Sequence, residues 1–263
     1  MKKIIMIPYL LVDNNKDYKP FILATYIYLY VRGGLDGMTY ASLNDILIYG
    51  YGYKNVNVTI QKDSIAATKK VIGMLQRRRF ILTISDPNTG EIIDINNATL
   101  KQQLCFDMSP MREQFNEKFV MLELENYNLI KSLEPSARWR TLILYLYFVY
   151  RIGYNPFKET SFREYWRSPY EDIANYLGDG FTKASMGKIF ATLRELGLIA
   201  YKSVYIDENC NIGNVVILQH GEPPNQIEER LKSASYRAKA EYKEFCVNKS
   251  LENAALAYAE KGA

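Results

Sequence analysis

Histidine and cysteine are scarce in this sequence. Its 263 residues include one histidine and three cysteines, which lie far apart and form no C-x-x-C pair. A histidine-based catalytic triad, a histidine-ligated metal cluster and a disulfide scaffold therefore have few residues to draw on. An odd number of scattered cysteines suits a reducing compartment, so we expect a cytoplasmic protein.

Long apolar runs are also missing. The most apolar stretch, residues 142–150, is nine residues long, whereas about 20 residues are needed to cross a bilayer. Residues 4–12 superficially resemble the apolar part of a signal peptide, but Pro8 interrupts them and polar residues follow where a cleavage site needs small ones. We therefore expect a strand at this position and no membrane association.

The sequence also lacks the usual motifs of catalysis. It has no phosphate-binding G-x-x-x-x-G-K-[ST] loop, and carboxylate pairs such as Asp45 with Asp63 cannot be assigned to one cleft. We expect no enzyme activity, no catalytic residue, no metal and no cofactor. With 48% hydrophobic residues and a formal net charge of +4, the composition is typical of a folded protein of one large or two modest domains.

Two parts of the chain repeat the same order of apolar segments. A tyrosine-rich run, residues 24–33, resembles residues 143–153, and residues 72–81 resemble residues 190–199. The two pairs are offset by about 119 and 118 residues, so they keep one register. This preserved order predicts one structural unit that occurs twice, here called the first and second copies.

The second copy has the clearest signals, and they predict three helices followed by a β-hairpin, the order of a winged helix. Its first helix is expected over about residues 137–150. Thr182 is the expected N-cap of the third helix, and Gly197 its end. The other signals are a capping box that begins at Ser168, helix-breaking glycines at 178 and 180, and strands over residues 198–205 and 214–218.

The first copy predicts the same order with different spacers. Its glycine- and asparagine-rich loop before the third helix is the longest of these spacers. The expected features are a helix over about residues 20–31, a second helix from the N-cap Ser42 to Tyr49, a third helix capped by Ser64, a hairpin over residues 80–85 and 91–95 that turns at residues 87–90, and a further strand over residues 101–106.

The chain ends in a segment of different composition. Its apolar residues recur at helical spacing, which predicts an amphipathic helix that either packs across its own domains or joins two chains in a homodimer. We therefore predict an α+β, mainly α fold of two tandem winged-helix domains, residues 1–112 and 113–221, and a C-terminal helical tail, residues 222–263. The spaced positions are Ile227, Leu231, Ala234, Ala238, Tyr242 and Phe245.

Positive charge is concentrated in the third helix of the first copy. Residues 61–80 contain six basic residues and one acidic residue. In helix-turn-helix proteins this helix enters the major groove of DNA, so its outward side chains contact the nucleic acid. The predicted contacts to double-stranded DNA are Lys62, Lys69, Lys70 and Arg77, for which a solvated helix face is the alternative.

The third helix of the second copy has a less charged outward face. Its basic candidates are Lys183, Lys188 and Arg194, and the alanines and glycine between them allow close approach to base edges or to a protein surface. In the hairpin turn of the first copy, Asn88 and Thr89 are secondary candidates, because wing tips touch phosphates or the minor groove. Turn chemistry alone explains those two residues equally well.

Several motifs suggest a family. Residues 6–13 (MIPYLLVD), the tyrosine-rich run, residues 42–46 (SLNDI) and residues 52–54 (GYK) resemble the N-terminal winged-helix domains of replication initiators and replisome organisers from plasmids and phages of low-GC Gram-positive bacteria. The similarity covers about residues 4–95. Through residues 171–178 (EDIANYLG), the second copy resembles winged-helix DNA-binding domains more generally.

The resemblance implies recognition of repeated origin sequences, duplex distortion and recruitment of host replication proteins. The chain departs from replisome organisers because its tail has no tryptophan: Trp139 and Trp166 both lie in the second copy. The sequence thus predicts a sequence-specific double-stranded DNA-binding protein, a plasmid or phage replication initiator. A winged-helix transcriptional regulator, or a winged-helix module that binds protein and not DNA, are the alternatives.

Overall fold

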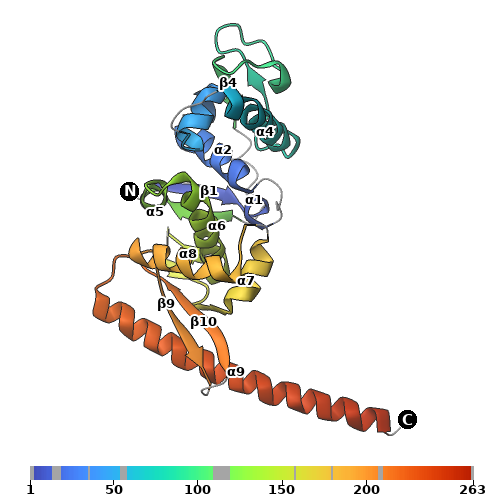
Figure 1. Ribbon diagram of the computed structural model, residues 1–263, viewed down its shortest axis with the longest axis vertical. Coiled ribbons are helices and arrows are strands. Elements are labelled where there is room, and N and C mark those ends of the chain that lie inside the picture. The colour runs from blue at the N-terminus through green and yellow to red at the C-terminus, as the bar shows by residue number, and fades with distance from the viewer. Residues whose placement is uncertain are drawn as a thin grey trace. The chain divides into compact units, whose positions relative to one another are not determined.

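The computed structural model contains helices and short strands in an α+β fold (Figure 1). More of its residues lie in helices than in strands. No helix among those described is long and apolar enough to span a bilayer. The structure describes residues 3–13, 19–34, 36–53, 58–108, 119–156, 158–178, 180–206 and 210–261.

The chain folds into two compact units. Unit 1 comprises Met1–Tyr147 and Pro156–Lys158, and unit 2 comprises Phe148–Asn155 and Glu159–Ala263. The cut between them runs through helix α6 (Pro135–Ile152), which is the expected first helix of the second copy. Much of that helix, together with the strand before it, therefore belongs to unit 1.

The apolar strings at the start of the two copies pair with each other. Strand β1 (Ile4–Pro8) runs antiparallel to β5 (Phe119–Glu123), with Met6 opposite Met121. The expected strand near the N-terminus is thus confirmed. Alternate residues of both strands are buried, including Ile7 and Leu122, so the pair presents one apolar face to the core of unit 1.

The first copy has the chain order helix, strand, helix, helix, strand, strand. In its three-stranded sheet the order is β2-β4-β3, so the last strand in the chain lies in the middle. Two short elements, α1 (Leu10–Asp13) and α5 (Leu124–Lys131), flank this series in unit 1. The series itself is α2 (Lys19–Arg32), β2 (Met38–Ala41), α3 (Leu43–Asp45) with the π-helical turn η1 (Ile46–Gly50), α4 (Val58–Arg77), β3 (Ile84–Ser85) and β4 (Leu104–Asp107).

One predicted cap in the first copy is confirmed and one is wrong. The Ser42 hydroxyl accepts a hydrogen bond from the Asp45 backbone N–H at 3.1 Å, and the Asp45 carboxylate accepts one from the Ser42 N–H at 2.8 Å. Ser64, by contrast, is buried inside α4, which already begins at Val58. A serine followed by an apolar residue also occurs within helices, so this local signal placed the helix start too late.

The predicted hairpin of the first copy is present, but its paired part is short. Strand β3 pairs along β4, which is the further strand expected over residues 101–106. The returning segment pairs with β3 through a bridge between Ser85 and Ile92, next to which the Ile93 N–H donates to the Ile84 carbonyl oxygen at 2.8 Å. Beyond it, the Asp94 side chain accepts the N–H of Asn96 and starts a short 3-10 helix, η2 (Ile95–Asn97), which ends any extended pairing.

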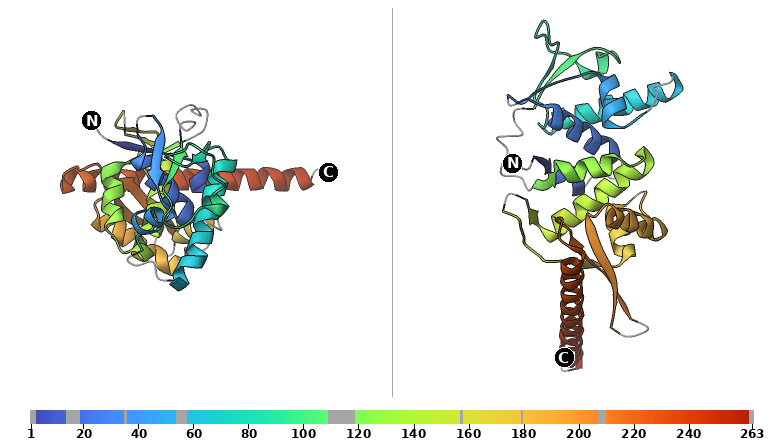
Figure 2. Two further views of the ribbon diagram at one scale, coloured as in Figure 1. Left: turned by 90° about the horizontal axis from the view of Figure 1, so that it is seen from above. Right: turned by 90° about the vertical axis from the view of Figure 1, so that its left-hand side faces the viewer.

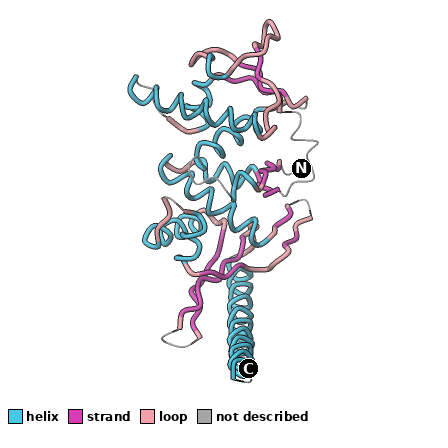
Figure 3. The backbone as a smooth tube through the Cα atoms, turned by 90° about the vertical axis from the view of Figure 1, so that its right-hand side faces the viewer, coloured by secondary structure: helices cyan, strands magenta, loops and turns pink. Residues whose placement is uncertain are grey.

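The second copy repeats the order of the first. Its sheet runs β8-β10-β9, again with the last strand in the middle. A small hairpin of β6 (Tyr154–Asn155) and β7 (Thr160–Ser161) precedes the sheet. After α6 the series is β8 (Trp166–Ser168), α7 (Tyr170–Leu177), α8 (Lys183–Glu195), β9 (Ile199–Tyr205) and β10 (Asn211–Leu218), shown as helices and strands in Figure 3.

The helix ends of the second copy follow the prediction with one exception. Thr182 caps α8, accepting the N–H of Ser185 at 3.1 Å, and Gly197 ends that helix with a φ of 69°. Ser168, however, forms no capping box, because it is the last residue of β8 and its backbone pairs with Asn214. Pro169 occupies the cap position without a side-chain hydrogen bond.

The tail forms one long helix, α9 (Pro224–Lys261), that packs on the β9–β10 hairpin of unit 2. Ala234 and Ala238 are buried against Val215 and Ile217 of β10. Ile227, Leu231 and Tyr242 pack against the same cluster, so the predicted packing of the helix across its own domain is confirmed for this half. Phe245 is 57% exposed, and Figure 2 shows the C-terminal part of α9 extending beyond the hairpin.

Candidate nucleic-acid interface

Tyr51 fixes helix α4 on helix α2 in unit 1. Its ring packs edge-on against Phe21 at 4.8 Å between centroids. Its hydroxyl lies 2.7 Å from the Thr25 hydroxyl on α2 and 3.4 Å from the Thr68 hydroxyl on α4. Burial raises the pKa of Tyr51 to about 12, although both threonine hydrogen bonds act in the opposite direction. The phenol therefore stays protonated and joins the two helices.

Helix α4 has one buried face and one basic face. Thr68, Val71, Ile72 and Leu75 are buried against the rest of unit 1. This spacing is that of a helix with a single apolar stripe, which leaves the opposite side for solvent. The exposed basic residues on α4 are Lys62, Lys70 and Arg77, three of the four predicted there.

Lys69, the fourth predicted residue of α4, has a different position. Its side chain is half-buried, and its ammonium donates a hydrogen bond to the Asn96 carbonyl oxygen at 2.7 Å. Asn96 belongs to η2, in the segment that returns from the hairpin turn. Lys69 thus connects α4 to that segment, and its charge is only partly directed to solvent.

The end of α4 carries more positive charge than the predicted contacts included. Arg78 and Arg79 follow Arg77 directly, and all three are exposed. Arg79 has a φ of 61°, so the chain leaves the helix through a left-handed residue. Cations are favourable at this end because the last carbonyls carry partial negative charge. Three exposed guanidinium groups therefore lie at the C-terminal end of α4, where the helix dipole favours positive charge.

The hairpin turn of the first copy is stabilised by its own polar groups. The Asp86 carboxylate accepts hydrogen bonds from the backbone N–H groups of Asn88 at 2.8 Å and Thr89 at 3.1 Å. Both predicted residues are exposed, as expected for a turn. Glu91 and Asp94 are also exposed nearby, so the segment around this turn is acidic and is unfavourable for a phosphate.

Helix α8 exposes all three of its predicted basic residues. Lys183, Lys188 and Arg194 lie on the solvent side, while Phe190 is fully buried on the other. At Gly187, apart from its neighbours in the helix, no described residue lies within 4 Å of the point where a side chain would begin. This face therefore carries small residues such as Ala184 and Gly187 together with three exposed cations.

A cluster of aromatic side chains packs α8 against the sheet. The Phe190 ring contacts Tyr170 at 4.7 Å and Tyr201 at 5.0 Å, both edge-on. The Arg194 guanidinium lies 5.4 Å from the centroid of the Tyr201 ring, within cation–π range. Tyr201 therefore orients a predicted contact residue. The sequence signalled β9 as a strand, but its pattern did not show which of its side chains meets α8.

Unit 2 contains a second group of basic and aromatic side chains. The Arg151 guanidinium lies 4.6 Å from the centroid of the Tyr176 ring and 5.1 Å from that of the Trp166 ring. Arg163 contacts the Trp166 ring at 5.2 Å. The four side chains alternate as aromatic ring and guanidinium, and they connect the end of α6, β8 and α7. Sequence reasoning did not find this group because its members come from three separate segments.

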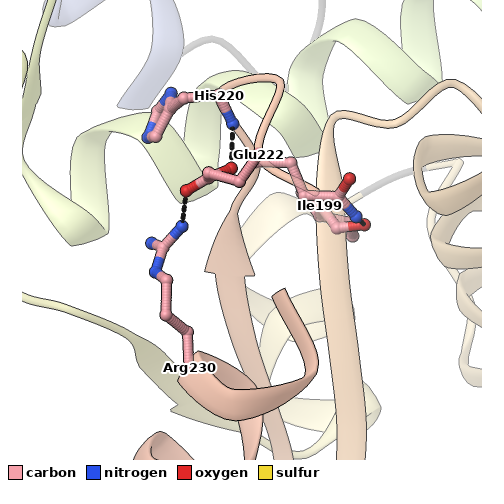
Figure 4. A network of polar contacts seen from close by, with 5 residues as sticks. Ile199, His220, Glu222 and Arg230 are labelled. Atoms are coloured by element: carbon pink, nitrogen blue, oxygen red, sulfur yellow. Dashed lines mark hydrogen bonds and ion pairs between the residues drawn. The ribbon is translucent and has the colours of Figure 1, made fainter. Parts of the chain in front are cut away.

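A polar network fixes the start of α9 (Figure 4). The Glu222 carboxylate accepts the backbone N–H of His220 at 2.7 Å and forms an ion pair with Arg230. His220, the single histidine, stacks on the Tyr154 ring at 4.1 Å. Partial burial acts to raise the pKa of Glu222, but the backbone hydrogen bonds and the charge of Arg230 outweigh it and lower the pKa.

Comparisons with protein-family models, with curated proteins and with solved structures find no match. Within the described part of the chain, no three His, Cys, Asp or Glu side chains gather in a way that could hold a metal ion. The interpretation of α4 and α8 therefore depends on their own geometry and charge.

Proposed function

We propose that this chain is a sequence-specific double-stranded DNA-binding protein in which the first and second copies are winged helices. The observation that carries the proposal is a repeated one. In both copies the helix before the last two strands, α4 or α8, has one buried apolar face and an exposed face with several basic residues. In both sheets the last strand is central, which is the strand order of winged helices. Winged-helix proteins place this helix in the major groove.

The two helices suit different kinds of contact. On α4, Lys62 and Lys70 together with the guanidinium groups at residues 77–79 provide charge for phosphate binding. On α8, the small residues around Gly187 allow the backbone to approach base edges, and Lys183 and Lys188 flank them. The major groove, about 12 Å wide, accepts an α-helix. We propose that α4 supplies most of the affinity and α8 more of the base readout.

Replication initiation is the role that the resemblance of residues 4–95 favours. In that role the protein would bind repeated origin sequences, and host replication proteins would be partners. A transcriptional regulator with the same two winged-helix copies would bind at a promoter. The two roles share one DNA-binding mechanism and differ in the location of the site.

A protein-binding module is the second candidate, and one observation favours it. The small residues on the exposed face of α8 would also accept a partner helix, and the turn around Asp86 in the first copy is acidic. This candidate predicts that neither helix binds DNA with sequence preference.

Footprinting of the full chain on DNA from its own replicon, over a range of salt concentrations, tests the proposal. If about six to eight phosphates are contacted, the logarithm of the binding constant should fall against the logarithm of salt concentration with a slope of about −5 to −7. Protected repeats in an origin support initiation, whereas protection at a promoter supports regulation. A flat salt response without any protected site contradicts DNA binding.

Matched charge reversals separate the two helices. Lys70→Glu on α4 is compared with Lys101→Glu, an exposed lysine of unit 1 outside α4. Lys188→Glu on α8 is compared with Lys239→Glu, an exposed lysine on α9. Each pair changes the net charge equally, so a larger loss of DNA affinity in the first member shows a local contact. Equal losses within both pairs contradict contact by these helices.

A further inference from the structure

A pocket in unit 2 lies where strand β8 meets helix α9. It has a volume of about 490 Å³, and its lining comes from two segments of the chain. Residues 163–167 lead into β8 and form its first two positions, and Arg237 and Glu241 lie one turn apart on α9. In the sheet order β8-β10-β9, β8 is an outer strand. The pocket is therefore formed by the edge of the sheet and the helix that packs on it.

The pocket belongs to the side of the sheet that α9 covers, and α8 covers the other side. On β9, Tyr201 contacts Phe190 of α8, whereas its neighbour Ala200 is part of the apolar cluster under α9. Successive side chains of a strand point to opposite faces of the sheet, so the two helices cover different faces. On β8, the Arg167 side chain meets the Tyr242 ring of α9. The pocket is thus separate from the basic face of α8, and this inference does not depend on DNA binding.

Two arginines on the β8 side of the pocket are held by aromatic rings. The Arg163 guanidinium lies 5.2 Å from the centroid of the Trp166 ring, and the Arg167 guanidinium lies 5.2 Å from that of the Tyr242 ring. Arg167 also donates a hydrogen bond to the Ile212 carbonyl oxygen at 2.8 Å. A guanidinium that lies over a ring contacts it with its face and keeps the N–H donors at its edge. Both side chains are therefore oriented and still have donors for a ligand.

The other polar groups of the pocket restrict the ligand further. Glu164 forms an ion pair with Arg237 at 2.7 Å, so these two charges compensate each other. Glu241 is exposed on α9, where its carboxylate repels a bare anion but accepts a hydrogen bond from a hydroxyl. The Tyr165 hydroxyl is buried and has no hydrogen-bond partner among the described residues. Burial raises the pKa of Tyr165, and Glu241 acts in the same direction, so the phenol stays protonated and remains a donor.

We propose that this pocket binds a small phosphate ester that also carries hydroxyl groups, which is the shared chemistry of sugar phosphates and nucleotides. A phosphate monoester has a charge of about −1.5 to −2 at pH 7 and three strong acceptor oxygens, so it suits the two guanidinium groups of Arg163 and Arg167. A carboxylate has two oxygens, which one guanidinium fork already satisfies. The hydroxyl groups of the ester donate to Glu241, whose charge disfavours inorganic phosphate. The two arginines thus select the phosphate, and the carboxylate selects the part of the ligand that bears hydroxyls.

Isothermal titration calorimetry of the full-length chain tests the proposal with four probes. Ribose 5-phosphate is the first, ribose lacks its phosphate, inorganic phosphate lacks its hydroxyl groups, and adenosine 5′-monophosphate adds a base. We expect both esters to bind at one site per chain, more tightly than inorganic phosphate, and ribose not to bind. Tighter binding of the nucleotide than of ribose 5-phosphate identifies a nucleotide site, and equal binding identifies a sugar phosphate site. The proposal is overturned if neither ester binds, or if inorganic phosphate binds as tightly as the esters.

Two variants locate the ligand in the pocket. Arg163→Gln should weaken the binding of ribose 5-phosphate about tenfold or more, as expected for lost hydrogen bonds to a charged group. Arg140→Gln, at an exposed arginine of α6 in unit 1, is the matched control and should bind as the wild type does. Glu241→Gln should reduce the preference for ribose 5-phosphate over inorganic phosphate. Equal affinities of Arg163→Gln and Arg140→Gln, with unchanged circular dichroism spectra, overturn the proposal. Displacement of ribose 5-phosphate by a DNA duplex assigns the pocket to the DNA interface and overturns it as well.

Discussion

The Lys69 ammonium lies 2.7 Å from the Asn96 carbonyl oxygen, which joins helix α4 to the segment that returns from the hairpin turn. Both partners are near the surface, so the bond contributes little to stability, at most about 1 kcal/mol. The bond holds the Lys69 side chain against the returning segment, where it is half-buried, whereas Lys70 is exposed. Lys69 and Lys70 are adjacent in sequence but differ in their exposure.

This difference predicts unequal effects on DNA binding. Lys70→Ala should reduce the steepness of the salt dependence by about 1, as expected for one lost phosphate contact. Lys69→Ala should change the salt slope less, because the Lys69 side chain is half-buried whereas that of Lys70 is exposed. Fluorescence anisotropy with labelled duplex DNA over a series of salt concentrations measures both slopes. A larger slope change for Lys69→Ala than for Lys70→Ala would contradict this assignment.

Removal of the Tyr51 hydroxyl should lower the stability of unit 1. Tyr51→Phe removes a buried hydrogen bond with Thr25 at 2.7 Å and leaves the Thr25 hydroxyl without this partner. The expected loss is about 1–3 kcal/mol in the free energy of unfolding. Tyr53→Phe is the control, because Tyr53 is half-buried and its hydroxyl is 3.4 Å from Ser64. Urea unfolding measures both variants, and equal losses would mean that Tyr51 does not hold α4.

Local signals in the sequence predicted most of the helices. The hydroxyls of Ser42 and Thr182 bind N–H groups three residues along the chain, so the information for these helix starts is contained in four residues. Gly178 and Gly197 end their helices with positive φ values, which glycine adopts without steric cost. The exposed basic residues of α4 and α8 were predictable for the same reason, because helical periodicity follows from the sequence alone.

Pairing between distant segments was not predictable in the same way. Strand β3 pairs with β4 as well as with the segment after its turn, and only the second pairing is local in the sequence. Ser168 resembled a helix cap, but its backbone is used by β10 through Asn214. The Lys69 contact with Asn96 spans 27 residues, and no local pattern indicates it.

Loss of the Thr182 cap should destabilise the start of α8. Thr182→Ala removes the acceptor for the Ser185 N–H and should cost about 1 kcal/mol. Thr192→Ala is a matched control in the same helix, since the Thr192 hydroxyl only donates to the Lys188 carbonyl within the helix. Alanine favours helix interiors, so that change should be close to neutral. Thermal unfolding compares the two, and a larger loss in Thr192→Ala would contradict the capping role.

The lowered pKa of Glu222 should make the stability of unit 2 depend on pH. Its pKa is lower in the folded chain than its ordinary value, because the His220 N–H and the Arg230 guanidinium favour the carboxylate despite partial burial. A lowered folded pKa means that the stabilisation is complete above the unfolded pKa of about 4.3. It is lost as the pH falls through the lower folded value. Acid should therefore weaken the attachment of α9.

Glu222→Gln removes this carboxylate, so the variant should unfold at lower urea concentration than the wild type at pH 7. The difference should shrink as the pH falls below the unfolded pKa, because the wild type loses the same interaction by protonation. Glu228→Gln, an exposed glutamate of the first turns of α9, is the control for the change of charge. If the difference between Glu222→Gln and the wild type stays constant between pH 7 and pH 3, the carboxylate does not hold the start of the helix through its charge.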